Sequence, residues 1–190
     1  YAVGESFKVG GSDYIVADRI MLDVAILNGE DVTRFCTSKI TSMDNLLSNQ
    51  VNFNQDIGAW DVSNVDNMKM MFKSAESFNQ DVSKWDVQNV VDMSEMFFDA
   101  KSFDQPLDNW DVGSVNDMGS MFQGAINYNK NIGDWDVSRV GNMLNMFYNA
   151  TVFNQDISGW CVPNLFVAPS GFSKYSALTQ SNHPIWGTCP

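Results

Sequence analysis

The chain has 190 residues, of which 44% are hydrophobic, so it is long enough for one domain with a sizeable core. Its 23 acidic and 11 basic residues give a formal net charge of −12, which argues against nucleic acid and anionic membranes as partners because phosphate groups would be repelled. No apolar run reaches the roughly 18 residues of a membrane-spanning helix, so we expect no membrane insertion in this segment. The first residue is Tyr1 rather than Met, so we expect flanking sequence and sorting signals to have been removed.

Residues 1–35 are expected to form an N-terminal cap. After a Gly-Gly turn, the sequence "SDYIVADRIMLDVAILNGE" predicts a strand and then a helix from about Asp18 to Leu27, which Asn28-Gly29 would end. The segment lacks the pattern of the residues that follow it, as expected for the terminal unit of a repeat array.

Residues 36–160 repeat with a period of 25 residues. The phrase "FNQDIGAWDVSNVDNMKMMFKSAES" from Phe53 returns as "FNQDVSKWDVQNVVDMSEMFFDAKS" from Phe78 with no spacer, and the first of about five repeats is degenerate. Periods of this size are typical of solenoids, propellers and arrays. A WD40 blade needs roughly 40 to 45 residues, and calcium-binding β-helices need glycine-rich nonapeptides. A leucine-rich-repeat-like arrangement remains.

The hydrophobic residues of one repeat predict its secondary structure. The Ile-x-x-Trp-x-Val part is compatible with a short strand, and the second half follows the spacing i, i+3, i+6, i+7 and i+10, typical of a helix of about three turns. The residues of that second half are Val65, Met68, Met71, Phe72 and Ala75. The predicted fold class is therefore α/β: a leucine-rich-repeat-like solenoid with one short strand and one short helix per 25-residue repeat, between N- and C-terminal caps.

Two polar columns recur at fixed phase in the repeats. The first column resembles the asparagine ladder of leucine-rich repeats and is expected to satisfy turn backbone; its members are Asn54, Asn79, Asp104, Asn129 and Asn154. The second column would place like charges about 5 Å apart, a repulsion of roughly 1 kcal/mol per pair; its members are Asp61, Asp86, Asp111 and Asp136. We expect these carboxylates to accept backbone N–H groups of the following turn, and calcium bridging or a basic ligand are the alternatives.

Residues 161–190 are expected to form a turn-rich C-terminal cap. Cys36 and Cys161 share a repeat phase, but five repeats would separate them by about 24 Å, whereas a disulfide tolerates about 7 Å between Cα atoms. Cys161 and Cys189 bracket the cap, so we predict that they form a disulfide and that the protein belongs to an oxidising compartment. Cys36 is left as a buried thiol or as the partner of a cysteine upstream of Tyr1.

The phrases "FNQDIGAWDVSNV", "NMFYNA" and "HPIWGTCP" resemble the BspA-like leucine-rich-repeat proteins of bacterial surfaces, in the branch with tryptophan-rich 25-residue repeats. The likeness spans roughly residue 30 to the end. It implies an exported or surface-displayed bacterial protein with an interaction or adhesion role. Pro106 and Asn131 replace the aspartate of the Phe-Asn-Gln-Asp phrase and Lys130 replaces its glutamine, so these repeats are expected to carry a local kink or a specialised surface.

Signals for catalysis are weak in this sequence. The single histidine, His183, lies in the turn-rich cap, and the aspartates recur at repeat phase instead of forming one distinctive pair. We therefore predict a non-catalytic extracellular or cell-surface module without a cofactor, which mediates protein–protein interaction or adhesion. The alternatives are a subunit of a surface fibre or sheath built by self-association and, more distantly, a polysaccharide-active enzyme; a surface glycan is a further candidate partner.

The candidate interaction surface lies in the last repeats. One position per repeat follows the buried Phe and should point outward, and it holds Phe98 and Tyr148, with Leu144 and Val152 four residues to either side of Tyr148. A contiguous apolar surface of this kind marks a contact site. The alternative is that flanking loops cover these side chains, which would then have no role in binding.

Overall fold

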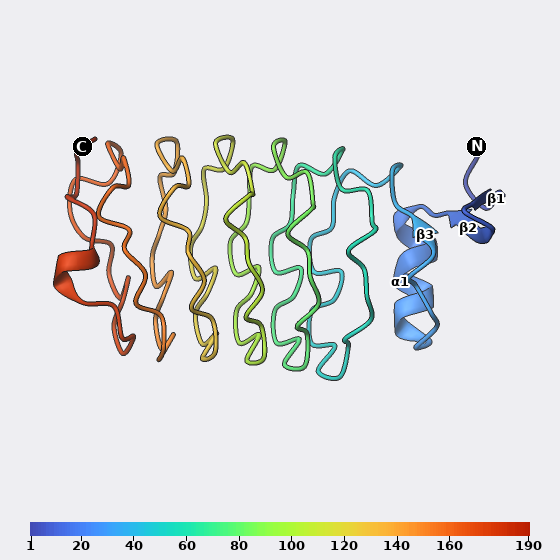
Figure 1. Ribbon diagram of the computed structural model, residues 1–190, viewed down its shortest axis with the longest axis horizontal. Coiled ribbons are helices and arrows are strands. Elements are labelled where there is room, and N and C mark those ends of the chain that lie inside the picture. Colours follow the sequence, from blue (N-terminus) through green and yellow to red (C-terminus); the bar gives the residue numbers. More distant parts are fainter.

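The computed structural model describes all residues from Tyr1 to Pro190 as a row of stacked layers, with the termini at opposite ends (Figure 1). Its regular elements are β1 (Ser6–Val9), β2 (Ser12–Val16), α1 (Arg19–Leu27), β3 (Phe35–Cys36) and the short 3-10 helix η1 (Gln180–Asn182). Four of these elements belong to the N-terminal unit. The repeats contain only isolated parallel bridges, which link Ser42, Asn67, Asp92, Asp117 and Asn142 in succession.

The N-terminal unit contains a three-stranded sheet and one helix. The strand order is β1-β2-β3, with β1 antiparallel and β3 parallel to β2. The strand and the helix predicted for this segment are confirmed, whereas β1 was not predicted. Because β3 spans residues 35 and 36, the sheet crosses the boundary expected between the cap and the first repeat.

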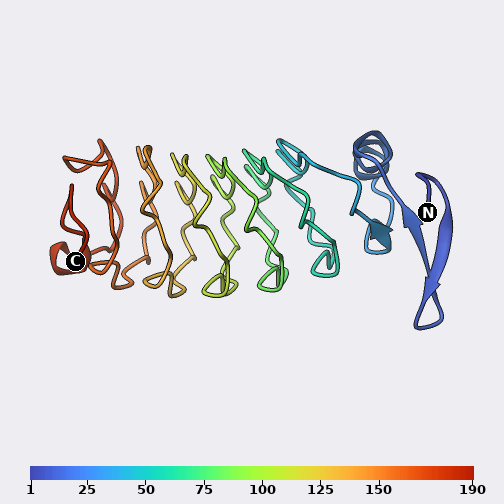
Figure 2. The ribbon, with the colours of Figure 1, turned by 90° about the horizontal axis from the view of Figure 1, so that it is seen from above.

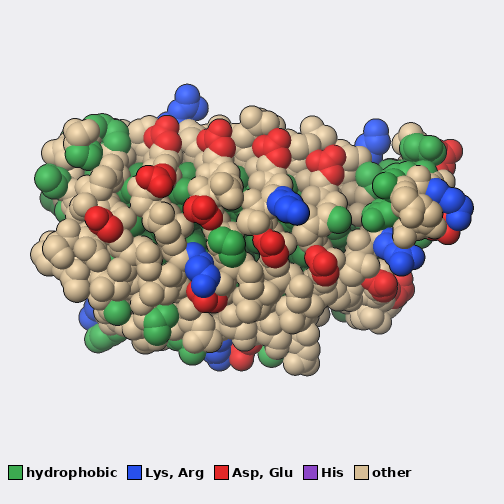
Figure 3. All heavy atoms as spheres, viewed as in Figure 1, with side chains coloured by type: hydrophobic (Ala, Val, Ile, Leu, Met, Phe, Trp, Pro, Cys, Tyr) green, Lys and Arg blue, Asp and Glu red, His purple; other side chains and the backbone are tan.

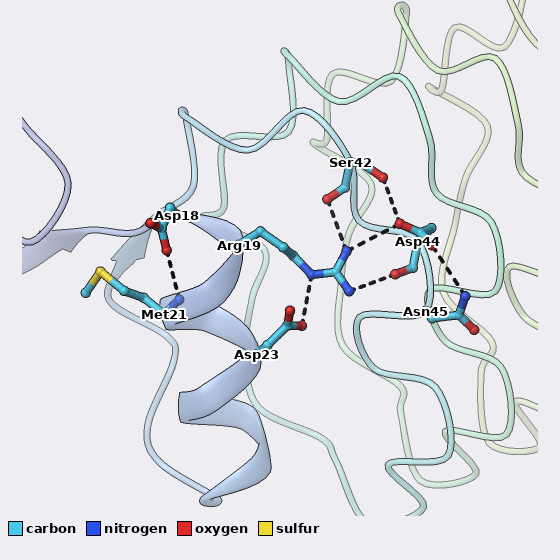
Figure 4. Close-up of polar contacts among 7 residues, drawn as sticks. All are labelled: Asp18, Arg19, Met21, Asp23, Ser42, Asp44 and Asn45. Carbon is cyan, nitrogen blue, oxygen red and sulfur yellow. Dashed lines mark hydrogen bonds and ion pairs between the residues drawn. The ribbon is translucent and has the colours of Figure 1, made fainter.

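Helix α1 is fixed at its start and along its inner face. The Asp18 carboxylate accepts the Met21 N–H at 2.9 Å, which satisfies a donor that the first turn leaves free (Figure 4). Leu22, Ala25 and Ile26 are buried. Arg19 donates to the carbonyl oxygens of Ser42 and Asp44 at 3.3 and 2.8 Å, so it ties the helix to the first repeat (Figure 4).

The expected α/β leucine-rich-repeat solenoid, with one strand and one helix in each repeat, is wrong. Apart from Cys36 at the end of β3, the repeats hold neither element, and consecutive turns occupy the segment in which the helix was expected. An α-helix requires each N–H to bond the carbonyl four residues back. Here every second N–H group closes a turn by donating to the carbonyl three residues back, as Met71 does to Met68 at 3.2 Å. The N–H groups between them donate to carbonyls of a neighbouring repeat.

The N–H groups that do not close turns donate to backbone carbonyls of the next repeat. Successive examples are Met68 to Asp92, Met70 to Ser94, Phe72 to Met96 and Ser74 to Phe98, at 2.7–3.0 Å. The chain reaches these geometries through left-handed residues, which a helix excludes. Met70 and Ser74 have φ of 55° and 57°, and the third position of a type II turn likewise requires a positive φ. The residues predicted to form one helical face are still buried, because each turn directs one or two of them inward.

The repeats lie in one row between the two terminal units (Figure 2). The core is one continuous cluster of 50 buried residues along this row. Equivalent aromatic rings stack from repeat to repeat: Phe72 on Phe97 with centroids 5.3 Å apart, Phe97 on Phe122 at 5.6 Å, and Trp85 on Trp110 at 6.5 Å. The indole N–H of each of the five repeat tryptophans donates to a carbonyl 28 residues earlier at 2.9–3.3 Å. The tryptophans therefore fill the core and fasten each repeat to the one before it.

Residues 161–190 continue the stack over the last repeat. Phe147 and Asn149 donate their N–H groups to the carbonyls of Phe172 and Lys174 at 2.7 and 2.9 Å, as they would to a further repeat. The predicted disulfide between Cys161 and Cys189 is present, and Cys36 is a free thiol. The last segment thus covers the exposed end of the core and is closed by a covalent bond.

One position of the Phe column holds a hydroxyl without a partner. Tyr128 is fully buried between Phe103 and Phe153, and its hydroxyl makes no hydrogen bond. We predict that Tyr128→Phe raises the free energy of unfolding by about 1 kcal/mol, because it removes a buried unpaired polar group. Chemical denaturation measures this change. The opposite change at the neighbouring position of the column, Phe103→Tyr, should destabilise the protein. A Tyr128→Phe variant that is less stable than the unmodified protein would contradict the prediction.

The disulfide provides a second prediction. Because Cys161 and Cys189 lie 28 residues apart, the bond should contribute roughly 3 to 4 kcal/mol through the entropy of the unfolded chain. Non-reducing mass spectrometry should find the two peptides linked, and reduction should lower the thermal midpoint. Cys36→Ala serves as the control, since it should leave both the linkage and the effect of reduction unchanged. Two alkylatable thiols at 161 and 189 in the unreduced protein would show that the bond is absent.

Candidate interaction surface

The asparagine column forms a hydrogen-bonded ladder between repeats. The Asn54 side-chain oxygen accepts the N–H of Asn79 at 3.0 Å and the side-chain amide of Gln80 at 3.0 Å. The Asn129 oxygen does the same for Asn154 and Gln155 at 3.0 and 2.8 Å. Each rung joins the turn of one repeat to that of the next. The column is therefore part of the scaffold, as its resemblance to an asparagine ladder predicted.

One rung of the ladder is charged, and it lies where the sequence departs from the Phe-Asn-Gln-Asp phrase. Asp104 replaces the asparagine and Lys130 replaces the glutamine, and the two side chains form an ion pair at 2.7 Å. The Asp104 carboxylate still accepts the N–H of Asn129 at 3.1 Å. The two substitutions compensate each other, because an acceptor and a donor meet here as they do in the amide rungs.

The second column, formed by the exposed residues Asp61, Asp86, Asp111 and Asp136, closes Asx turns. Each carboxylate accepts the N–H of the residue two positions later, at 3.0–3.3 Å. The hydroxyl of Ser138 and then its N–H lower the pKa of Asp136. This is the arrangement expected from the sequence. No three His, Cys, Asp or Glu side chains lie close enough together to hold a metal ion, so calcium bridging stays an untested alternative.

Further Asx turns occur that the sequence reasoning did not single out. Asp81 and Asp156 accept the N–H groups of Ser83 and Ser158, at 2.9 and 3.0 Å. Asn131 makes the same bond to Gly133 at 2.9 Å, so it replaces aspartate without loss of the turn. The signal was present in the sequence as Asp or Asn two residues before Ser or Gly. Most of the repeated carboxylates thus accept backbone N–H groups of their own turns.

The four residues of the candidate surface differ in exposure. Leu144 and Val152 are exposed, by 46% and 42%. Tyr148 is half-buried, because the Tyr175 ring packs edge-on against it with centroids 5.3 Å apart. Phe98 is also half-buried, and the Lys73 ammonium lies 4.9 Å from its ring centroid. The C-terminal segment therefore covers part of the stripe, and Leu144 is its most exposed member.

The structure adds two residues to this surface. Phe166 and Val167 are 81% and 76% exposed, and they line a hollow of about 470 Å³ together with Leu144, Met143 and Leu165. We call Leu144, Phe166 and Val167 the C-terminal patch. Sequence reasoning missed Phe166 and Val167 because they lie beyond the last repeat, where the repeat phase no longer predicts exposure. Their hydrophobicity in a turn-rich segment was the signal that could have found them.

Charge is distributed unevenly along the chain. Acidic side chains recur along the row of repeats (Figure 3), whereas residues 161–190 contain no Asp or Glu and a single basic residue, Lys174. Hydrophobic side chains gather at both ends of the same face (Figure 3). The C-terminal patch therefore belongs to the least acidic part of the molecule. No helix is long and apolar enough to cross a membrane.

Two other features outside the patch contain titratable side chains. His183 accepts from or donates to the Ser173 hydroxyl at 3.1 Å and packs edge-on against Phe172, and burial lowers its pKa. No carboxylate occurs within residues 161–190 to orient this pair. A polar hollow of about 650 Å³ lies beside β2, with Arg34 and Lys84 as its cations and Asp56 and Asp81 as its anions.

The stacked layers of 25 residues, fastened by recurring side-chain columns, define a repeat protein. The family described as "Mycoplasma protein of unknown function, DUF285" matches residues 18–118 and again residues 88–186. Because these overlapping matches cover most of the chain, the chain belongs to this family. No curated protein and no solved structure matches it.

The Asx turns provide a prediction with a pH dependence. Asp136→Ala should lower the free energy of unfolding by about 1 kcal/mol, as expected for a lost backbone-capping acceptor, whereas Asp136→Asn keeps the acceptor and should cost less. Because hydrogen bonding lowers the folded-state pKa of Asp136 below 3.8, its contribution is complete above that pH and lost on acidification. Denaturation at pH 7 and pH 3 measures both effects. Equal losses for the two variants would show that the turn does not depend on the acceptor.

Proposed function

We propose that this chain is a non-catalytic repeat module of the bacterial cell surface or extracellular space, which contacts a protein partner. The C-terminal patch carries this proposal. Its members Phe166 and Val167 are among the most exposed hydrophobic residues of the chain, and with Leu144 they line one hollow. Contiguous exposed apolar surface rimmed by polar residues is typical of protein contact sites.

Two further observations support the location. The Cys161–Cys189 disulfide is of the kind that persists in oxidising compartments such as the outside of the cell. The phrases "FNQDIGAWDVSNV" and "HPIWGTCP" resemble those of BspA-like bacterial surface proteins, for which interaction or adhesion is expected. The high negative charge favours solubility and disfavours contact with anionic membranes.

The geometry of the carboxylates favours a binding role over the polysaccharide-active alternative. A glycosidase requires two carboxyl groups that are free to act as acid and as base or nucleophile. In this chain the aspartates of the second column, such as Asp61 and Asp111, accept N–H groups of their own turns. These residues are therefore better explained as parts of the scaffold, and the exposed apolar residues are better candidates for function.

Attachment of the purified protein to the surface of cells that produce it tests this proposal. Phe166→Ser and Leu144→Ser should each weaken attachment at least about tenfold, because exposed apolar anchors at the centre of a contact dominate its affinity. Tyr148→Ser should have a smaller effect, since Tyr175 already covers that ring. Val91→Ser is the matched control, because Val91 is 40% exposed but lies outside the patch.

The nature of the partner is tested on the same cells. Protease treatment of the cells should abolish attachment, whereas periodate oxidation of their glycans should leave it unchanged. Thermal midpoints of all variants close to that of the unmodified protein would show that the fold is intact. Attachment that survives both patch substitutions would contradict the proposal, and loss after periodate alone would favour a surface glycan as the partner.

A further inference from the structure

Helix α1 presents a second exposed apolar face, at the opposite end of the molecule from the C-terminal patch. Leu22, Ala25 and Ile26 of α1 are buried, but Ile20 and Val24 are 73% and 51% exposed. The two lie one helical turn apart, so they form one stripe on the outer side. The N-terminal unit therefore leaves an apolar helix face without a partner.

This face borders a hollow between α1 and the sheet. The hollow has a volume of about 500 Å³, and six of its eight lining residues are hydrophobic. We call it the α1 hollow; its apolar residues are Ile15, Ile20, Met21, Val24, Ala25 and Phe35. Glu30 and Asp31 line its remaining part. It is therefore an apolar concavity with an acidic border, and its volume exceeds that of an aromatic side chain.

The C-terminal patch offers exposed apolar side chains in a segment without carboxylates. Phe166 and Val167 are adjacent in the chain and 81% and 76% exposed, so both side chains are accessible to a second molecule. Residues 161–190 carry one lysine and no acidic residue, whereas residues 1–35 carry six acidic and three basic residues. The acidic end thus holds the α1 hollow, and the end without carboxylates holds the exposed pair Phe166 and Val167.

We propose that the partner of the C-terminal patch is a second copy of this chain, whose α1 hollow receives Phe166 and Val167. The proposal rests on the proposed function and names the partner of the same patch. Contact between two N-terminal units would bring their acidic borders together, and contact between two C-terminal patches would leave both α1 hollows open. The head-to-tail contact alone buries both apolar faces, and it places the acidic border of the α1 hollow against a segment without carboxylates. Because each copy keeps one free end, such contacts continue into a ring or an open chain.

Analytical ultracentrifugation of the full chain over a range of concentrations tests this arrangement. The unmodified protein should form species larger than a dimer as concentration rises. Phe166→Ser and the double variant Ile20→Ser/Val24→Ser should each weaken self-association at least about tenfold, because each removes one side of the contact. Val91→Ser should assemble like the unmodified protein.

Mixing the two defective variants distinguishes the modes of contact. Phe166→Ser keeps an intact α1 hollow and the double variant keeps an intact patch, so an equimolar mixture should form a dimer of one copy of each and nothing larger. A double variant that dimerises alone would show contact between two C-terminal patches and overturn the proposal. Unchanged thermal midpoints establish that the variants are folded.

The result separates this inference from the proposed function. An unmodified protein that stays monomeric at every concentration, yet attaches to cells through Phe166, would overturn self-association and leave a different protein as the partner. A protein that assembles head to tail but does not attach to cells would support the inference and make the chain a subunit of a surface fibre. Variants that lose neither property would overturn both proposals.

Discussion

The stack depends on where the repeats direct their backbone N–H groups. In each repeat, alternate donors cross to the carbonyls of the following repeat, as those of Met68 and Phe72 do to Asp92 and Met96. The donors between them close turns within the repeat. No repeat can satisfy its backbone alone, so each layer requires the next, and the last one requires the C-terminal segment. A helix would have satisfied the same donors internally and left the layers joined by side chains only.

Side chains fix the register that these bonds require. The indole N–H of each repeat tryptophan donates to a carbonyl 28 residues earlier, and the asparagine ladder joins positions 25 residues apart. The pair of Asp104 and Lys130 shows that a rung is defined by donor and acceptor and not by residue type, since an ion pair replaces an amide pair. Each of these contacts links neighbouring repeats, so stability is expected to be shared along the row.

The two ends of the row differ in chemistry as well as in structure. A helix and a three-stranded sheet cover one end, and a disulfide-closed segment without carboxylates covers the other. Both ends still leave hydrophobic side chains in contact with solvent, in the α1 hollow and the C-terminal patch. The repeats between them place their polar columns on the surface. The proposed contacts therefore lie at the ends, where the repeating pattern stops.

The sequence by itself determined the period, the buried residues, the polar columns, helix α1 and the disulfide, because each depends on residue type at a fixed spacing. It did not determine secondary structure in the repeats. The spacing of Met68, Met71 and Phe72 suits a helix and a series of turns equally well, and only bonding between layers decided for turns, with Met70 and Ser74 left-handed. Tertiary structure also decided which candidates stay exposed, since the C-terminal segment covers Tyr148 and leaves Leu144 beside Phe166.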